Sequence, residues 1–119
     1  MTTESVSHSR VLLRAFLRCR DDGAVSRLQP LLLQALDGFD PRWSGPPERY
    51  AKLPEWVEFT LDLAPATRQT FDAVTALQPL GWTHGGDDDD RSSVWVARPR
   101  LRLLRRELKW AELIFTQRR

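Results

Sequence analysis

The chain has 119 residues, 41% hydrophobic, 29% charged and 9% aromatic, a composition typical of one globular domain and unlike that of collagen-like or disordered chains. Its single cysteine excludes an internal disulfide framework and a cysteine-based zinc cluster. No apolar run reaches the roughly 18 residues of a membrane-spanning helix, and no secretory signal is visible. We therefore expect a cytoplasmic protein with a flexible N-terminus at residues 1–8 and a single domain at residues 9–119.

Positive charge is concentrated towards the end of the chain. Residues 1–90 hold nine basic and fourteen acidic side chains, whereas residues 91–119 hold nine basic and two acidic ones. The net charge is only +2, so this asymmetry predicts one electropositive surface and one electronegative loop on the same molecule.

An alternating pattern near the N-terminus predicts a strand. From Val11 to Cys19 every odd-numbered residue is apolar, and a period of two places these side chains on one face, against a core. An amphipathic helix is the alternative, because Arg10, Arg14 and Arg18 would also share one helical stripe. We favour the strand.

A helix and a long loop are predicted next. Asp21 or Asp22 is suited to cap a helix whose apolar residues recur at helical spacing until Gly38. Pro30 lies within this stretch, so the helix either kinks there or begins there. Residues 38–54 hold four prolines and two glycines, which predicts a loop that is ordered by its aromatic side chains.

A second strand and a second helix follow this loop. Residues 55–63 alternate between apolar and polar side chains, which predicts a strand with one buried face. Pro65 suits the first position of a helix, and an apolar stripe continues this helix to Leu80.

Three further strands are expected in the C-terminal third. Two short ones lie between residues 81 and 97 around a polar turn, and a basic connection at residues 98–106 leads to the last one at residues 108–116. In the last strand Ala111, Leu113 and Phe115 share one face. The opposite face would carry Leu108, Trp110, Glu112 and Ile114.

This order of elements predicts an α+β fold. The simplest arrangement that buries the apolar faces of these elements is a single domain with a mostly antiparallel sheet of four to five strands and two helices packed on one face. The polar side chains on the other face of the sheet would then meet water or a partner.

The sequence offers little for catalysis or cofactor binding. Asp87 to Asp90 are consecutive, so their side chains point in different directions and at most two could hold one cation. His84 lies near this run and invites an aspartate–histidine relay, but no motif places a nucleophile beside it. Cys19 falls on the apolar face of the first strand, where thiols pack. We expect no catalytic residue, no metal and no cofactor.

Aromatic and acidic side chains are the candidates for contact with a protein partner. Tryptophan and tyrosine dominate interaction hot spots, and several lie in the loop or on the polar side of a strand. The aspartate run adds an acidic tip. The predicted partner-binding residues are Trp43, Tyr50, Trp56, Asp87, Asp88, Asp89 and Asp90.

The arginine-rich connection supports an alternative, nucleic-acid binding. Five guanidinium groups within nine residues could neutralise several phosphates, and tryptophans flank them. Interleaved leucines suggest instead a loop whose arginine stems cover apolar surface. The alternative nucleic-acid-binding residues are Arg98, Arg100, Arg102, Arg105 and Arg106.

These features predict a non-catalytic protein-binding module. Its most specific form is an immunity-type inhibitor of a bacterial toxin that acts by surface complementarity, since an acidic tip would suit a basic, nuclease-like target. The alternatives are an arginine-rich nucleic-acid-binding protein and a small ligand-binding or enzymatic α+β domain with His84 as acid–base group. We expect a monomer or a homodimer, with no membrane association.

Overall fold

The alternating segment near the N-terminus is the central strand of the sheet. The structure, a computed structural model, describes residues 9–117, and the flexible segment expected at residues 1–8 lies outside this range. Strand β1 (Arg10–Arg18) buries its odd-numbered side chains and pairs antiparallel with β4 (Leu53–Leu63) and with β7 (Leu108–Thr116). The strand prediction is therefore confirmed.

Seven antiparallel strands form one sheet, in the order β2-β4-β1-β7-β6-β5, with β3 also paired to β4. The expected count of four to five strands was too low, because the proline-rich segment contributes two short strands that pair with the edge of β4. Its prolines cannot donate to a ladder, which limits each strand to two or three residues. The remaining strands are β2 (Arg42–Trp43), β3 (Glu48–Tyr50), β5 (Trp82–Gly86) and β6 (Asp90–Val96).

Helix α1 (Asp22–Ala35) begins where the sequence predicts. The Asp21 side chain accepts the backbone N–H of Ala24 at 2.8 Å, which satisfies one of the free donors of the first turn. Pro30 lies inside the helix rather than at its start. A single 3-10 turn (Asp37–Phe39) follows.

Helix α2 (Arg68–Ala76) is shorter than predicted at both ends. Its N-cap is Thr67, whose hydroxyl accepts the backbone N–H of Thr70 at 3.2 Å, so Pro65 precedes the helix instead of opening it. Leu80 lies beyond the helix and is exposed. Within residues 9–117, no helix is long and apolar enough to cross a membrane.

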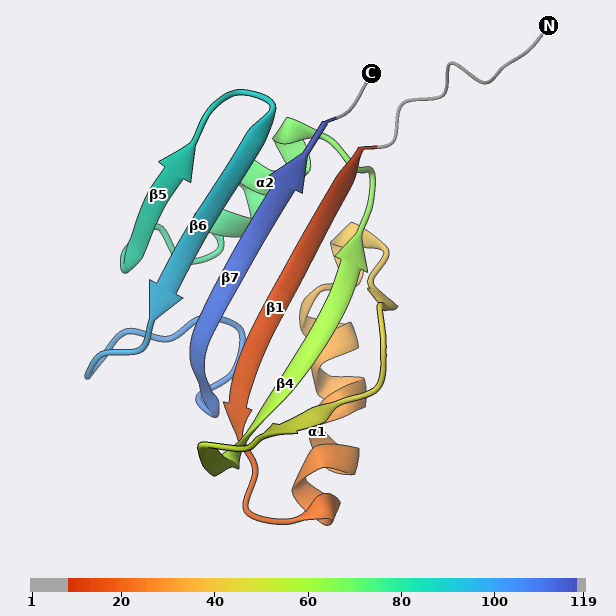
Figure 1. The fold of residues 1–119 in the computed structure, drawn as a ribbon, viewed down its shortest axis with the longest axis vertical. Coiled ribbons are helices and arrows are strands. Elements are labelled where there is room, and N and C mark those ends of the chain that lie inside the picture. The colour runs from red at the N-terminus through yellow and green to blue at the C-terminus, as the bar shows by residue number, and fades with distance from the viewer. Residues whose placement is uncertain (1–8, 118–119) are drawn as a thin grey trace, which may run out of the picture.

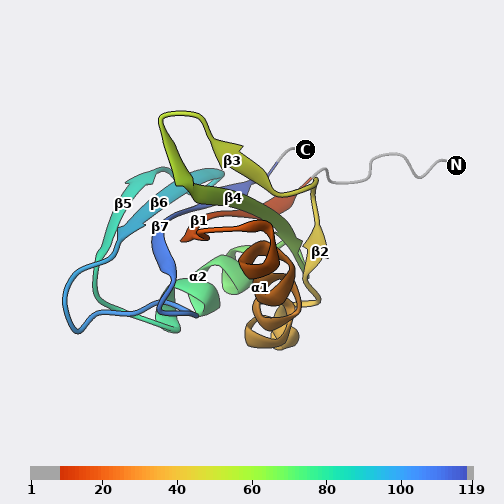
Figure 2. The same ribbon diagram turned by 90° about the horizontal axis from the view of Figure 1, so that it is seen from below.

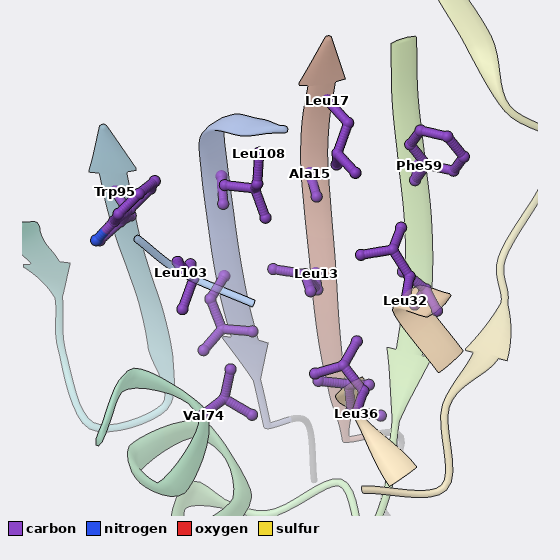
Figure 3. Close-up of a cluster of buried hydrophobic side chains, with 14 of the residues drawn as sticks. Leu13, Ala15, Leu17, Leu32, Leu36, Phe59, Val74, Trp95, Leu103 and Leu108 are labelled. Atoms are coloured by element: carbon purple, nitrogen blue, oxygen red, sulfur yellow. The ribbon is translucent and has the colours of Figure 1, made fainter. Parts of the chain in front are cut away.

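Both helices pack on the same face of the sheet, and the core lies between them and the strands (Figure 2). Figure 3 shows the side chains that meet there: Leu13 and Phe59 from the sheet, Leu32 from α1, Leu36 from the residue that caps the end of α1, and Val74 from α2. Trp95 is the largest fully buried side chain, and its indole N–H donates to the Leu80 carbonyl at 3.0 Å. The single domain with two helices on one face is thus confirmed.

A β-bulge changes the orientation of one predicted residue. Phe16 pairs with Trp110 but Leu17 pairs with Leu108, so Lys109 is an extra residue on β7. The extra residue shifts the alternation of side chains, and Leu108 turns into the core (Figure 3). The prediction that Leu108 shares a face with Trp110 was therefore wrong.

We expect Leu13→Ala to lower the free energy of unfolding by about 2–5 kcal/mol, because this fully buried side chain leaves a cavity in the centre of the core. Leu80→Ala is the matched control: its side chain is 65% exposed, so the change should stay below about 0.5 kcal/mol. Urea unfolding followed by circular dichroism measures both. Equal losses in the two variants would contradict this placement of the core.

Candidate functional site

The face of the sheet opposite the helices is the candidate site. Figure 1 shows the strands from this side with the helices behind them, and among residues 9–117 no helix covers it. The register places the even-numbered side chains of β1 here, beside partners from β4 and β7. The uncovered face is thus a mixed surface of aromatic, apolar and charged side chains, and not the polar surface that an unpartnered sheet usually presents.

A charged ladder crosses the middle of this face. Nε of Arg14 donates to Glu58 Oε2 at 2.7 Å, and Nη1 of Arg14 donates to Glu112 Oε1 at 2.8 Å. The second oxygen of Glu112 accepts the Ser92 hydroxyl at 3.0 Å. The hydrogen bond to Glu58 is the main cause that raises the pKa of Arg14, so its charge persists across the acid and neutral range. The ladder joins four neighbouring strands.

Four aromatic rings meet next to this ladder. Phe16 is central, with ring centroids 5.4 Å from Trp110, 5.7 Å from Tyr50 and 6.4 Å from Trp56. The Arg14 guanidinium lies over the Phe16 ring at 5.9 Å. These five side chains line a hollow of about 330 Å³, which we call the aromatic pocket.

The hairpin of β3 and β4 supplies one wall of the aromatic pocket. Figure 2 shows it rising from the sheet on the side away from the helices, and Tyr50 lies at its end. The Arg49 guanidinium holds the hairpin in place: it donates to the carbonyls of Cys19 at 3.0 Å and Pro54 at 2.9 Å, and to the Asp22 carboxylate at 3.0 Å. The position of Tyr50 is therefore fixed by contacts with the end of β1 and the start of α1.

The aromatic residues predicted to bind a partner do not all lie together. Tyr50 and Trp56 share the aromatic pocket, whereas Trp43 packs against Phe59 at 6.1 Å between centroids, on the helix-covered side. Phe16 and Trp110 are not among the residues predicted to bind a partner. The alternation of the first strand does place Phe16 on its polar side, where it is the one aromatic residue, and the structure brings it next to Trp56.

The aspartate run forms the turn between β5 and β6, away from the aromatic pocket. Asp87 Oδ1 accepts the backbone N–H groups of Asp89 and Asp90, both at 2.9 Å. Asp88 instead pairs with Arg68 at 3.2 Å and with Arg91 at 3.7 Å. Within residues 9–117, no cluster of three or more acidic, histidine or cysteine side chains is arranged to hold a metal ion. The run is an acidic turn held by its own backbone.

The strand pairing keeps this turn and the aromatic pocket apart. Asp90 pairs with Thr116, which pairs with Arg10 at the beginning of β1, whereas Trp56 pairs with Arg18 at its end. One partner would have to span the length of the sheet to touch both. The two sets of predicted partner-binding residues therefore belong to separate surfaces.

His84 and Cys19 lie apart from the aromatic pocket. His84 Nδ1 lies 2.6 Å from the Ser93 hydroxyl, and its ring stacks on Trp82 with centroids 6.5 Å apart. Cys19 is fully buried, and this burial raises the pKa of its thiol. The contacts of His84 are with its own hairpin rather than with the aspartates.

The arginine-rich connection holds arginines with and without an acidic partner. Arg105 and Arg106 lie 3.4 and 3.7 Å from the Glu107 carboxylate. Arg98, Arg100 and Arg102 line a cavity beside the start of α1, which Arg106 and Glu107 also line. Leu103 of the same segment is fully buried in the core (Figure 3). The connection is thus fixed to the fold by its leucine side chains.

No family model, curated protein or solved structure matches the chain. Trp, Tyr and Arg side chains contribute most of the binding energy at protein interfaces, and all three residue types meet in the aromatic pocket. The uncovered face is therefore the candidate interface.

We expect Arg14→Met to lower the free energy of unfolding by about 1 kcal/mol at pH 7, because Glu58 and Glu112 are left without their shared cation on either side of β1. The loss should shrink when salt is added, because added ions screen charge pairs that are partly exposed to solvent. Urea unfolding at low and at high salt measures this. Arg42→Met, which removes an exposed guanidinium outside the ladder, is the control; a loss that is the same at both salt concentrations would contradict the role of charge.

The pKa of Asp87 is held below its ordinary value by the backbone N–H groups of Asp90 and Asp89. The carboxylate therefore stabilises the turn fully above the usual aspartate pKa of about 3.9. This stabilisation is lost as the pH falls through the lowered pKa of Asp87 in the folded protein. In an NMR titration the amide proton shifts of Asp89 and Asp90 should move with a midpoint below about 3.9, and Asp87→Ala should abolish this transition. A midpoint at or above the ordinary value would contradict the hydrogen bonds.

Proposed function

We propose that the protein is a non-catalytic protein-binding module that contacts its partner with the uncovered face of the sheet, centred on the aromatic pocket. The observation that supports this most is the meeting of four aromatic rings around a hollow of about 330 Å³ on a face with no covering helix among the described residues. Apolar surface of this kind on a sheet favours burial against another molecule.

The aromatic rings of this face favour a cationic group on the partner. The charges of the face are nearly balanced, because the strand register places five carboxylates and four arginines on it. The π-faces of the aromatic pocket attract cations. A lysine or arginine side chain of the partner would therefore be drawn to the aromatic pocket. The carboxylates are those of Glu48, Glu58, Asp62, Asp90 and Glu112, and the arginines are Arg10, Arg14, Arg18 and Arg42.

The most specific form of the proposal is an immunity-type inhibitor of a bacterial toxin, acting in the cytoplasm by surface complementarity. A toxin that cleaves nucleic acid needs a basic surface for the phosphates of its substrate, and a cationic side chain of such a surface would suit the aromatic pocket.

Partner capture tests the proposal. The full chain is immobilised, proteins retained from cell extract are quantified by mass spectrometry, and each candidate is purified and titrated by calorimetry. We expect Tyr50→Ala and Trp110→Ala each to weaken binding of the partner at least about tenfold, as truncation of a hot-spot side chain does. Tyr50 is 39% exposed at the end of a hairpin, so Tyr50→Ala should leave the fold intact even if Trp110→Ala does not.

Leu77→Ala is the matched control, because Leu77 is an exposed apolar side chain that follows α2 on the other side of the sheet. A purified partner that binds Tyr50→Ala and Trp110→Ala as tightly as it binds Leu77→Ala contradicts the proposal. So does a chain that self-associates through this face in sedimentation and loses the association in Tyr50→Ala. The inhibitor form requires further that the partner be an enzyme whose activity the protein abolishes.

A further inference from the structure

A second concave surface lies at the end of the sheet where β1 finishes. Here the end of β1, the first turn of α1 and the connection between β6 and β7 enclose a cavity of about 820 Å³, which we call the basic basin. Figures 1 and 2 show the connection and the start of α1 at this same end of the molecule. Cavities of this size are typical of small-molecule sites.

The basic basin carries a large excess of positive charge. Eight cationic side chains line it, against two carboxylates, Asp21 and Glu107. Partial burial acts to raise the pKa of Glu107, but its own backbone N–H and the charges of Arg105, Arg106 and Arg27 outweigh this and lower it. Glu107 is thus an anion surrounded by arginines.

Four arginines of the basic basin have no acidic partner. Within residues 9–117, no ion pair or side-chain hydrogen bond links Arg20, Arg98, Arg100 or Arg102 to a carboxylate, whereas every other arginine in this range makes such a pair. Like charges gathered in one concavity repel each other, and a bound anion with several negative charges relieves that repulsion. The four guanidinium groups therefore favour a polyanionic ligand.

The backbone conformation of Arg100 indicates that its side chain serves a purpose other than forming the turn, such as binding a ligand. Arg98 to Leu101 form a turn in which the Leu101 N–H donates to the Arg98 carbonyl at 3.0 Å and Pro99 holds the second position. Arg100 occupies the third position with φ of 68°, a left-handed conformation that glycine adopts more readily than any other residue. An arginine at this position is not explained by the turn itself.

We propose that the basic basin binds a compact polyphosphorylated small molecule through its unpaired arginines. One guanidinium group can donate two parallel hydrogen bonds to the oxygens of a phosphate. Several guanidinium groups line this one cavity. No aromatic side chain lines the basin, so it lacks the stacking platforms on which single-stranded nucleic acids lie. The first turn of α1 adds positive partial charge, but Asp21 already accepts the Ala24 N–H, so the arginines rather than the helix amides would bind the ligand.

Calorimetric titration of the full chain with inorganic tripolyphosphate tests this inference, with orthophosphate and a short single-stranded oligonucleotide as comparison ligands. We expect tripolyphosphate to bind tightest and its affinity to fall as salt is added. Arg100→Gly should weaken binding about tenfold, as loss of a charge-assisted phosphate contact does. Its melting temperature should stay equal or rise, because glycine suits the backbone conformation. Arg42→Ala, an arginine outside the basic basin, should change neither.

Three outcomes would overturn the inference: equal binding by Arg100→Gly and Arg42→Ala, binding of orthophosphate as tight as that of tripolyphosphate, or tighter binding of the oligonucleotide than of tripolyphosphate. The last would favour the nucleic-acid alternative for this segment. The two sites are tested separately, because Tyr50→Ala should keep its affinity for tripolyphosphate and Arg100→Gly should keep its protein partner.

Discussion

Strand β1 pairs with β4 along one edge and with β7 along the other, and this double pairing determines which side chains meet on both faces of the sheet. Its odd-numbered side chains form the middle of the core, and its even-numbered ones, Arg14 and Phe16 above all, form the middle of the uncovered face. Because a strand alternates strictly, a slip of one residue would exchange the two sets. The same register therefore maintains the core and assembles the candidate interface.

Two surfaces of opposite character result from this arrangement. The uncovered face combines aromatic rings with carboxylates and arginines that pair with each other, whereas the basic basin at the end of β1 holds arginines without acidic partners. Arg49 lies between them: its guanidinium reaches the Asp22 carboxylate at the start of α1, while the hairpin that carries it supplies Tyr50 to the aromatic pocket. One small domain thus presents the candidate interface and the proposed anion-binding basin on different sides.

Several site residues could not be predicted from their own neighbourhood in the sequence. Trp110 lies on the uncovered face with Leu108 turned into the core, because one extra residue, Lys109, interrupts the alternation of β7. Trp43 was expected to be available to a partner, but a two-residue pairing with β4 directs it towards Phe59. Bulges and short edge pairings depend on the partner strand, and the partner lies far away along the chain.

The sequence by itself determined the α+β class, the strand at β1, an aspartate cap at Asp21 or Asp22 and the separation of charge between the two parts of the chain. These features arise from interactions among residues a few positions apart, so that periodicity and composition reveal them. Only the tertiary structure decided the seven-strand order, the meeting of Phe16 with Tyr50 and Trp110, and the basin formed by arginines from three elements. Each of these depends on strand register and on packing between distant segments, which local patterns do not encode.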